Sequence, residues 1–438
     1  MSNDPFVIIG ANCCFPGEDL NIEDIQSYHD LLINKKSVIK NPPKERFNTE
    51  GFLYKGGFLK GIDLFDANFF NLSASQVKQM DPQQRQFLEV SIRAVQQANI
   101  RLESLKGSFT GVFCGASTSE YSQLNHKDNI GITAYTPIGI SNAAISGRLS
   151  HFLDLKGPSL TVDTACSSSF SALNIAINSI KENQCSMAIV GGVHLSFCIE
   201  SFEGVSRAKM LSKTDFSKSF DLNADGYARS EGCAVIIIKR MSNAIKNKDN
   251  ILAIIKSIQT NQDGSGGGAG ISSPDVNAQT ILQKNTIAKA NLSSCDIDYI
   301  ETHGTGTLKG DLVEFQALKC VFENRQTKNR LIVGALKGNI GHILAASGLA
   351  SVIKIINAFK SNVIPANLIN EQTSQLMDFS KIQAVFPIDN YSYEMKSKKS
   401  RKALVSNFGF SGTNVCTILE EPPQKLKLSS DTKQGDHC

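Results

Sequence analysis

The sequence lacks any run that approaches the ~18 apolar residues of a membrane span. Its opening stretch, MSNDPFVIIGANCCFPG, lacks the basic segment and the long apolar segment of a secretory signal. Charge of one sign is scarce too, because 45 Lys and Arg residues against 41 Asp and Glu residues leave a net charge of only +4. This surplus is too small to indicate nucleic acid as a partner. We therefore expect a cytoplasmic protein that binds neither membranes nor nucleic acid.

The eleven cysteines show no paired CxxC spacing and no short disulfide-rich framework. This spacing argues against a structural zinc site and against a secreted disulfide scaffold. Cys185, His194 and Cys198 are close in sequence, but the segment CSMAIVGGVHLSFC has the composition of a buried strand. We therefore predict no metal site, and we expect most of the cysteines to be reduced and buried.

Apolar residues make up 41% of the 438 residues and charged residues 20%, which is typical of a globular protein with a large core. Short β-branched runs alternate with longer helical patterns, which predicts an α/β fold whose strands are buried on both faces. The predicted strands are 111–117, 159–164, 186–193, 232–240, 251–259, 297–303, 331–336 and 402–410, and the clearest helices are 82–100 and 275–292. No internal repeat is visible. We expect one compact unit followed by a polar tail, residues 422–438.

Residues 162–170, VDTACSSSF, place Cys166 between an extended stretch and the start of an amphipathic helix. Ser167 or Ser168 can cap that helix. A thiol at this turn would face free N–H groups of the helix, which lower a thiol pKa and can stabilise a developing oxyanion. The alternative is a small buried residue at a tight corner. The stretch alone leaves both interpretations open.

Two of the seven histidines, His303 in ETHGTGT and His342 in KGNIGHILAASG, follow predicted strands and lie in glycine-rich turns. Sites of α/β proteins form in such loops, where glycine lets a ligand approach the backbone closely. The histidines that lack this setting are His29, His126, His151, His194 and His437. His303 and His342 are therefore the candidate site residues, although a lone histidine is more often structural.

Cysteine, histidine and histidine at positions 166, 303 and 342 stand within a longer series of motifs. The series is FVIIGANCCFPG, GGFLKGIDLFDANFF, MDPQQRQFLEV, ISGRLSHFLDLKGPSLTVDTACSSS, FDLNADGYARSEG, HGTGT, KGNIGH, NFGFSGTN and ILEEP. Over about residues 5 to 421 the chain resembles a β-ketoacyl synthase, specifically the ketosynthase of type I polyketide synthases. The resemblance implies a thiolase-like five-layered αβαβα fold of two similar halves with mixed sheets, 1–250 with the cysteine and 251–421 with the two histidines, paired in a homodimer.

The resemblance also implies the chemistry of the site. Cys166 would take an acyl group from a phosphopantetheine thioester, and a malonyl carrier would lose carbon dioxide to give an enolate that attacks the acyl-cysteine. His303 and His342 would donate hydrogen bonds to the malonyl thioester carbonyl and stabilise the enolate. The backbone N–H groups of Cys166 and Phe410 would form the oxyanion hole.

Further residues match the family's supporting positions. Lys337 and Glu314 correspond to an ion pair that positions the histidines, since a buried lysine without a partner would be costly. Thr305 and Thr307 correspond to threonines that contact the pantetheine arm. The aromatic residues of the family's gating loop correspond to Phe408 and Phe410.

The resemblance implies no tightly bound cofactor, with substrates carried on the phosphopantetheine of an acyl carrier protein, or on coenzyme A. The sequence carries no carrier or acyltransferase segment, so the carrier is expected to act in trans. Whether the pathway makes polyketides or fatty acids stays open. The main alternative is a non-elongating ketosynthase that loads and transfers acyl chains without condensation. A catalytically silent partner protein is disfavoured because such proteins replace the cysteine, and a thiolase is disfavoured because its second catalytic cysteine has no matching motif.

Two positions depart from the family pattern. After GTN the family usually continues with alanine and histidine, whereas this chain has Val415 and Cys416. In the segment TLKGDL, Lys309 replaces an apolar residue, which could change carrier docking or the shape of the loop.

One basic run, KSKKSRK at 396–402, precedes the predicted strand that leads to Phe408. Acyl carrier proteins are typically acidic, and opposite charge raises the on-rate of a transient partner. The run is therefore a candidate carrier-docking site. A solvated loop remote from the active site is an equally good interpretation.

Overall fold

The structure is a computed structural model that describes residues 4–47, 54–117, 119–127, 131–214, 216–268, 270–327, 329–368, 373–394 and 400–423. The strands are β1 (Phe6–Cys14), β2 (Gly56–Gly57), β3 (Thr110–Ala116), β4 (Ser159–Val162), β5 (Met187–His194), β6 (Arg229–Ser230), β7 (Gly232–Arg240), β8 (Ala253–Gln262), β9 (Tyr299–Glu301), β10 (Leu331–Gly334), β11 (Val363–Ile364), β12 (Ala384–Val385), β13 (Tyr391–Ser392), β14 (Lys402–Phe408) and β15 (Thr413–Glu420). The helices are α1 (Ile25–Ile33), α2 (Ala74–Gln79), α3 (Pro82–Gln97), α4 (Tyr121–Lys127), α5 (Thr136–Gly139), α6 (Ala143–Phe152), α7 (Ser168–Lys181), α8 (Ile199–Arg207), α9 (Met241–Asn247), α10 (Val276–Lys289), α11 (Leu308–Phe322), α12 (Lys337–Ile340) and α13 (Ser347–Ser361).

Each of the predicted strands and both predicted helices are present. The sequence did not predict β1 or β15, although both lie in the middle of the main sheet. Strands β1, β3 and β5 are buried along their whole length, as expected for strands covered on both faces.

The main strands hydrogen-bond in the order β12-β10-β9-β14-β15-β8-β1-β7-β5-β3-β4. On one side β4, β3 and β5 run parallel and are followed by antiparallel β7 and β1. On the other side β10, β9 and β14 run parallel and are followed by antiparallel β15 and β8. The two halves therefore have the same pattern of strand directions, and they meet where β1 pairs with β8. The repeat is therefore visible in the strand topology, although no internal repeat was visible in the sequence.

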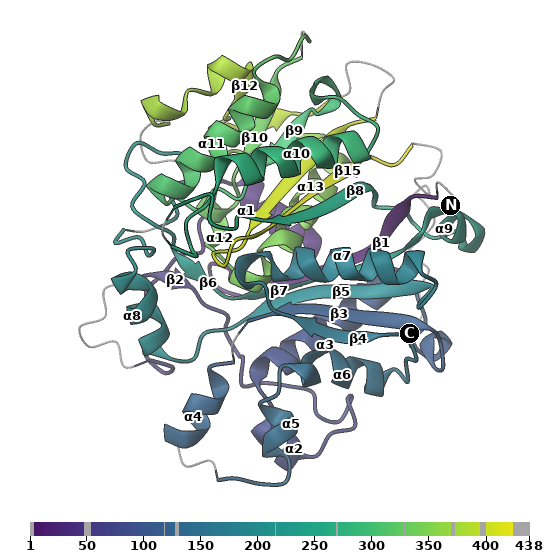
Figure 1. The fold of residues 1–438 in the computed structure, drawn as a ribbon. Helices are drawn as coiled ribbons and strands as arrows, with labels where there is room; N and C mark the ends of the chain where they lie inside the picture. Colours follow the sequence, from purple (N-terminus) through teal and green to yellow (C-terminus); the bar gives the residue numbers. More distant parts are fainter. Residues whose placement is uncertain are drawn as a thin grey trace.

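The helices form layers around these strands (Figure 1). Helices α3 and α6 cover the outer face of the first half, and α10 and α11 lie over the outer face of the second. Helices α7 and α13 lie between the halves, where they contact each other and strands of both. This is the five-layered thiolase-like arrangement that the sequence predicted. The connections also correspond: β4 leads directly into α7, as β10 leads through α12 into α13. The amino ends of the two central helices therefore follow equivalent strand ends.

Candidate functional site

Cys166 lies in a short 3-10 turn, Ala165–Ser167, between β4 and α7. The residue before it, Ala165, has a φ of +56°, a conformation that costs energy for a residue with a side chain. The turn is held by Ser168, whose hydroxyl accepts from Thr164 N (2.9 Å) and donates to the Ala165 carbonyl (2.6 Å). The prediction that a serine caps α7 is wrong, because the N-cap residue Ser167 makes no side-chain capping bond.

Glycines in the strands below allow this turn to lie close to the sheet. A Cβ added at Gly115 in β3 would lie 2.3 Å from the Ser169 nitrogen. A Cβ at Gly192 in β5 would lie 2.8 Å from both Ser169 Cβ and the Ala345 carbonyl oxygen. The two strands therefore carry glycine where the starts of α7 and α13 approach them.

The Cys166 side chain is buried, with 6% of the residue exposed, and its Sγ lies 3.1 Å from His342 Nε2. Burial raises the pKa of the Cys166 thiol to about 11, whereas the charge of Lys337 and the backbone N–H groups of Phe410 and Cys166 act to lower it. The predicted depression of this pKa is therefore wrong: desolvation outweighs the N–H groups and nearby cations. The predicted oxyanion-hole N–H groups do face the sulfur.

His303 and His342 lie side by side, with ring centroids 5.5 Å apart. Burial, followed by the charge of Lys337, lowers the pKa of both well below the ordinary value, so both rings are neutral. His303 Nδ1 is 3.2 Å from Asn407 Nδ2 and 3.5 Å from Lys337 Nζ. Because Lys337 Nζ can only donate, His303 Nδ1 accepts and Nε2 carries the ring proton.

His342 is oriented by groups that the motifs did not single out. Its Nδ1 lies 2.9 Å from Ser347 Oγ in the first turn of α13. The Tyr227 ring lies edge-on to it, with centroids 4.9 Å apart. Sequence reasoning missed Asn407, Ser347 and Tyr227 as contacts of the two histidines. Asn407 and Tyr227 lie inside the quoted motifs NFGFSGTN and FDLNADGYARSEG, and Ser347 lies five residues after His342, which was the available signal.

Lys337 and Glu314 are both buried, as their supporting role requires. The structure describes both residues and shows no direct ion pair between Lys337 and Glu314. Lys337 Nζ donates to the His303 carbonyl, while the Glu314 carboxylate accepts from the N–H groups of His303 and Gly304, both at 2.8 Å. Burial raises the pKa of Glu314 and lowers that of Lys337. The two residues therefore hold the His303 backbone from both sides, which corrects the expected pairing.

The predicted gating and pantetheine residues differ in exposure. Phe408 is buried with its ring centroid 5.6 Å from that of His303, whereas Phe410 is 57% exposed. Thr305 and Thr307 are half-buried, and their hydroxyls lie 2.9 Å apart. Phe408 thus packs against the histidine, and Phe410 presents its ring to solvent while its N–H faces Cys166.

The two departures from the family pattern lie in different environments. Val415 and Cys416 are fully buried in β15, where Cys416 Sγ lies 3.3 Å from Ser406 Oγ. Lys309 is exposed in the first turn of α11, and its Nζ donates to Ser273 Oγ at 3.0 Å.

The basic run 396–402 does not supply the expected exposed cluster where it is described. Lys396, Lys398 and Lys399 lie outside the described residues. Arg401 is buried and paired with Glu421 at 2.7 Å, and Lys402 begins β14, at the opposite end of that strand from Phe408. The described residues of the run, Arg401 and Lys402, therefore form no exposed cluster beside Phe408, and the rest of this prediction lies outside the described residues.

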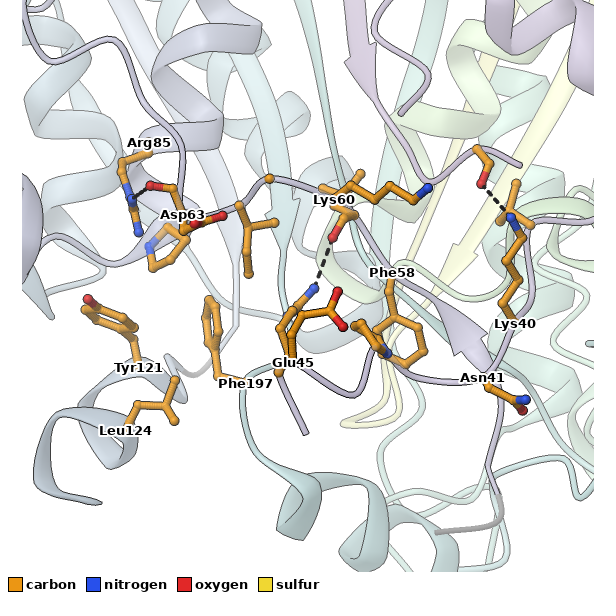
Figure 2. Close-up of a pocket in the computed structure, with 18 residues that line it drawn as sticks. Lys40, Asn41, Glu45, Phe58, Lys60, Asp63, Arg85, Tyr121, Leu124 and Phe197 are labelled. Carbon is orange, nitrogen blue, oxygen red and sulfur yellow. Dashed lines mark hydrogen bonds between the residues drawn. The ribbon is translucent and has the colours of Figure 1, made fainter. Parts of the chain in front are cut away.

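A separate cavity of about 840 Å³ lies beside α4 (Figure 2). Apolar side chains such as Tyr121, Leu124 and Phe197 line one end of it, where Arg85 also lies, and Lys40 lies at the opposite end. None of the predicted site residues is among its lining residues. Within the described part of the chain, no helix is long and apolar enough to cross a membrane.

Comparison with known proteins agrees with this geometry. Residues 3–244 match the family "Beta-ketoacyl synthase, N-terminal domain", and residues 252–370 match "Beta-ketoacyl synthase, C-terminal domain". A component of the phenolphthiocerol/phthiocerol polyketide synthase from Mycobacterium tuberculosis is 34% identical over 434 residues, and a highly reducing polyketide synthase from Didymella fabae is 35% identical over 446 residues. These alignments cover 96% and 98% of this chain, but only 23% of each relative.

Solved structures of ketosynthases show the same fold. The ketosynthase from module 6 of the bacillaene synthase of Bacillus subtilis 168 matches with a TM-score of 0.89 and 31% identity, over 96% of this chain and 72% of that one. A Streptomyces albus JA3453 oxazolomycin ketosynthase domain matches with a TM-score of 0.90 and 30% identity, over 96% and 76%. With both family domains matched in order along the sequence, the chain belongs to the β-ketoacyl synthase family.

Proposed function

We propose that this protein is a β-ketoacyl synthase that joins a Cys166-bound acyl group to a malonyl unit by decarboxylative Claisen condensation. The observation that carries the proposal is the meeting of Cys166 Sγ with His342 Nε2 at 3.1 Å, beside His303 and two backbone N–H groups. A nucleophile, hydrogen-bond donors and an oxyanion site are the groups that this reaction needs.

In the loading step the Cys166 sulfur attacks the thioester carbonyl of the acyl donor. The S–H proton moves by way of His342 Nε2 to the departing thiol, so that neither sulfur is left as a buried anion. The N–H groups of Cys166 and Phe410 stabilise the oxyanion that forms. The buried thiol is protonated at rest, and the proton transfer therefore accompanies attack.

In the condensing step the malonyl thioester loses carbon dioxide, and its C–C bond electrons form an enolate. The Nε2–H of His303 donates to the enolate oxygen. Neutral His342 is the second donor in the tautomer that carries its proton on Nε2, while its Nδ1 accepts from Ser347 Oγ. The enolate carbon then attacks the acyl-cysteine carbonyl, the C–S bond breaks, and the Cys166 sulfur leaves as a thiolate that takes a proton from water. The presence of both histidines favours condensation over acyl transfer alone.

The substrates are proposed to arrive on the phosphopantetheine arm of an acyl carrier protein in trans, or on coenzyme A, with Thr305 and Thr307 along the arm. We propose polyketide biosynthesis as the pathway and no tightly bound cofactor. The chain spans about a quarter of the length of the curated relatives. Their printed names, as polyketide synthases, support the pathway but not a particular product.

We also propose a homodimer in the cytoplasm. Strand β4 is the outermost strand of the described sheet, and its Leu160 is 45% exposed, which suits a strand edge that is covered by a second copy.

The halves are proposed to divide at residue 250, because α9 ends at Asn247 and β8 opens the second repeat at Ala253.

The decisive experiment supplies acyl carrier and malonyl carrier together and follows both carbon dioxide and the carrier-bound product by mass spectrometry. Condensation predicts a β-ketoacyl carrier in equal amount to the carbon dioxide released. Acyl transfer without carbon dioxide would identify a non-elongating enzyme instead. No acylation with any donor would overturn the proposed function.

A further inference from the structure

A buried ion pair that the motifs did not assign lies next to the reacting groups. Arg229 Nη2 donates to Glu120 Oε1 at 2.8 Å, and each residue is only 6% exposed. The remaining groups of Arg229 are also engaged: Nη1 donates to Ser201 Oγ at 2.8 Å, and Nε lies 3.4 Å from His194 Nε2. A cation in this position is expensive to bury, so its retention calls for a reason beyond packing.

The backbone around Arg229 holds His342. The His342 N–H donates to the Ala228 carbonyl at 2.7 Å, and the Ser230 N–H donates to the His342 carbonyl at 2.9 Å. Arg229 therefore lies between Ala228 and Ser230, the two residues whose backbone hydrogen bonds fix the main chain of His342. A movement of this short strand would change the position of the imidazole relative to Cys166.

The partner carboxylate ties the same cation to a second segment. Glu120 Oε2 accepts from the N–H groups of Phe197 at 2.8 Å and Cys198 at 2.9 Å. Phe197 lines the 840 Å³ cavity (Figure 2). Cys198 is the N-cap residue of α8. The pair therefore stands between the cavity wall and the histidine.

Arg229 also contributes to the electrostatics of the reacting groups. Its charge is the last of several causes that act to lower the pKa of Cys166, after Lys337 and the backbone N–H groups of Phe410 and Cys166. It also acts to lower the pKa of His342, after burial, Lys337 and His194. The other titratable groups that act on these two are His194 on His342 and the phenol of Tyr227 beside Cys166. His303, whose ring contacts that of His342, is neutral. Among the described residues, Lys337 and Arg229 are thus the cations that act to favour the thiolate.

We propose that Arg229, held by Glu120, is a positioning residue that fixes the His342 backbone and supplies positive charge that favours the thiolate of Cys166. This inference rests on the proposed role of Cys166 as the nucleophile. It assigns opposite effects to the two members of one ion pair. Removing Arg229 removes charge that favours the thiolate, whereas neutralising Glu120 removes a counter-charge and leaves the cation more effective.

The test is the rate of Cys166 alkylation by iodoacetamide as a function of pH, scored on the Cys166 peptide by mass spectrometry. For Arg229→Gln we expect the rate at pH 8 to fall about threefold to tenfold and the profile to move to higher pH. For Glu120→Gln we expect the rate to rise and the profile to move to lower pH. Arg229→Lys keeps the charge and should stay close to the wild type.

A matched control uses a second arginine–glutamate pair, in which Glu231 is buried and the Arg46 side chain is 15% exposed. Arg46 donates to Glu231, and neither residue contributes to the electrostatics of Cys166 or His342. Arg46→Gln is expected to lower the melting temperature without moving the alkylation profile. Melting curves of all variants distinguish a variant that has lost its fold from one that has lost only the electrostatic effect on Cys166.

The inference is overturned if Arg229→Gln leaves the profile in place, or if Arg229→Gln and Glu120→Gln move it in the same direction. If Arg229→Gln does not fold, Glu120→Gln decides, since a slower or unchanged rate in that variant contradicts the proposal. Alkylation needs no carrier or malonyl substrate. Its outcome is therefore distinct from a failure of the condensing activity, which would appear as absence of acylated Cys166 or of product in the carrier assay.

Discussion

The two halves of the molecule each contain a turn from strand to central helix, and the two turns have closely similar backbones. Ala165 in the first has a φ of +56° and Leu344 in the second a φ of +41°. Each begins a three-residue 3-10 turn, Ala165–Ser167 or Leu344–Ala346, that leads directly into a buried helix. The second position of the turn is Cys166 in one half and Ala345 in the other.

The serine that begins each helix also differs in its use. Ser168 binds within its own turn, to Thr164 and Ala165. Ser347 instead lies 2.9 Å from His342 Nδ1. The same backbone therefore presents a thiol in the first half and orients an imidazole in the second. The comparison indicates that the strained turn is a structural device common to both halves, and that the side chains divide the chemistry between them.

Replacing Cys166 with alanine makes the first turn like the second and should have the largest effect. We expect acyl loading and condensation to fall to the background level, because the nucleophile is gone. The fold should persist, since Ala345 shows that such a turn accepts alanine. Peptide mass mapping after incubation with acyl carrier measures loading, with Cys320→Ala, which removes an exposed thiol, as the control. Acylation of the Cys166→Ala protein at the wild-type stoichiometry would contradict the assignment.

Removing the histidines tests the division of labour between the turns. His303→Ala and His342→Ala should each slow carbon dioxide release from malonyl carrier by about 10²–10³-fold, because each removes a donor to the enolate. His303→Ala should leave the loading rate unchanged. His342→Ala should lower the loading rate as well, because Nε2 contacts Cys166, but by a smaller factor than it lowers the rate of decarboxylation. The exposed His151→Ala serves as the control. Wild-type carbon dioxide release in His303→Ala would end the enolate role of that residue.

Sequence reasoning identified the three side chains that the structure brings together, Cys166, His303 and His342, because each lies in a contiguous motif at a strand end. It could not predict that burial would raise the pKa of Cys166, since desolvation depends on the whole surrounding core. The family resemblance implied that Lys337 and Glu314 pair directly, but both contact the His303 backbone instead. Arg229 went unassigned because its partners come from segments far apart in the chain.

The fold shows the same limit. Sequence reasoning did not predict β1 or β15, although both contain several β-branched residues. Strand β1 joins the halves, and β15 pairs with the strand that ends at Phe408. The internal repeat became visible only in the strand directions. Local composition identifies a strand, but the order of strands in a sheet depends on contacts that are distant in sequence.

Gly192 touches both turns, so its replacement tests their common support. A Cβ there would lie 2.8 Å from the Ala345 carbonyl oxygen, Ala346 Cα and Ser169 Cβ. We expect Gly192→Ala to lower the free energy of unfolding by about 1–3 kcal/mol, as overpacking in a buried site does. Gly147→Ala is the matched control, because open space surrounds that position in α6 and alanine there should stabilise the helix by about 0.5–1 kcal/mol. Equal urea midpoints for the two variants would show that the turns do not rest closely on β5.

The pH dependence of stability distinguishes the two turns most finely, because the first carries a titratable thiol where the second carries a methyl group. Burial raises the pKa of Cys166 from its ordinary value of 9.0 to about 11, so the folded state binds the thiol proton more tightly than the unfolded state. The stabilisation that results is fully present below pH 9 and is lost as the pH rises through 11. Between pH 8 and pH 10 the wild type should therefore lose about 1–1.5 kcal/mol of unfolding free energy relative to Cys166→Ala. Urea unfolding of both proteins under reducing conditions measures this difference, and taking the difference cancels the titration of the other cysteines. If the two stability curves run parallel from pH 8 to pH 10, burial does not raise the pKa of the Cys166 thiol in the folded protein. The two turns would then not differ in their electrostatics.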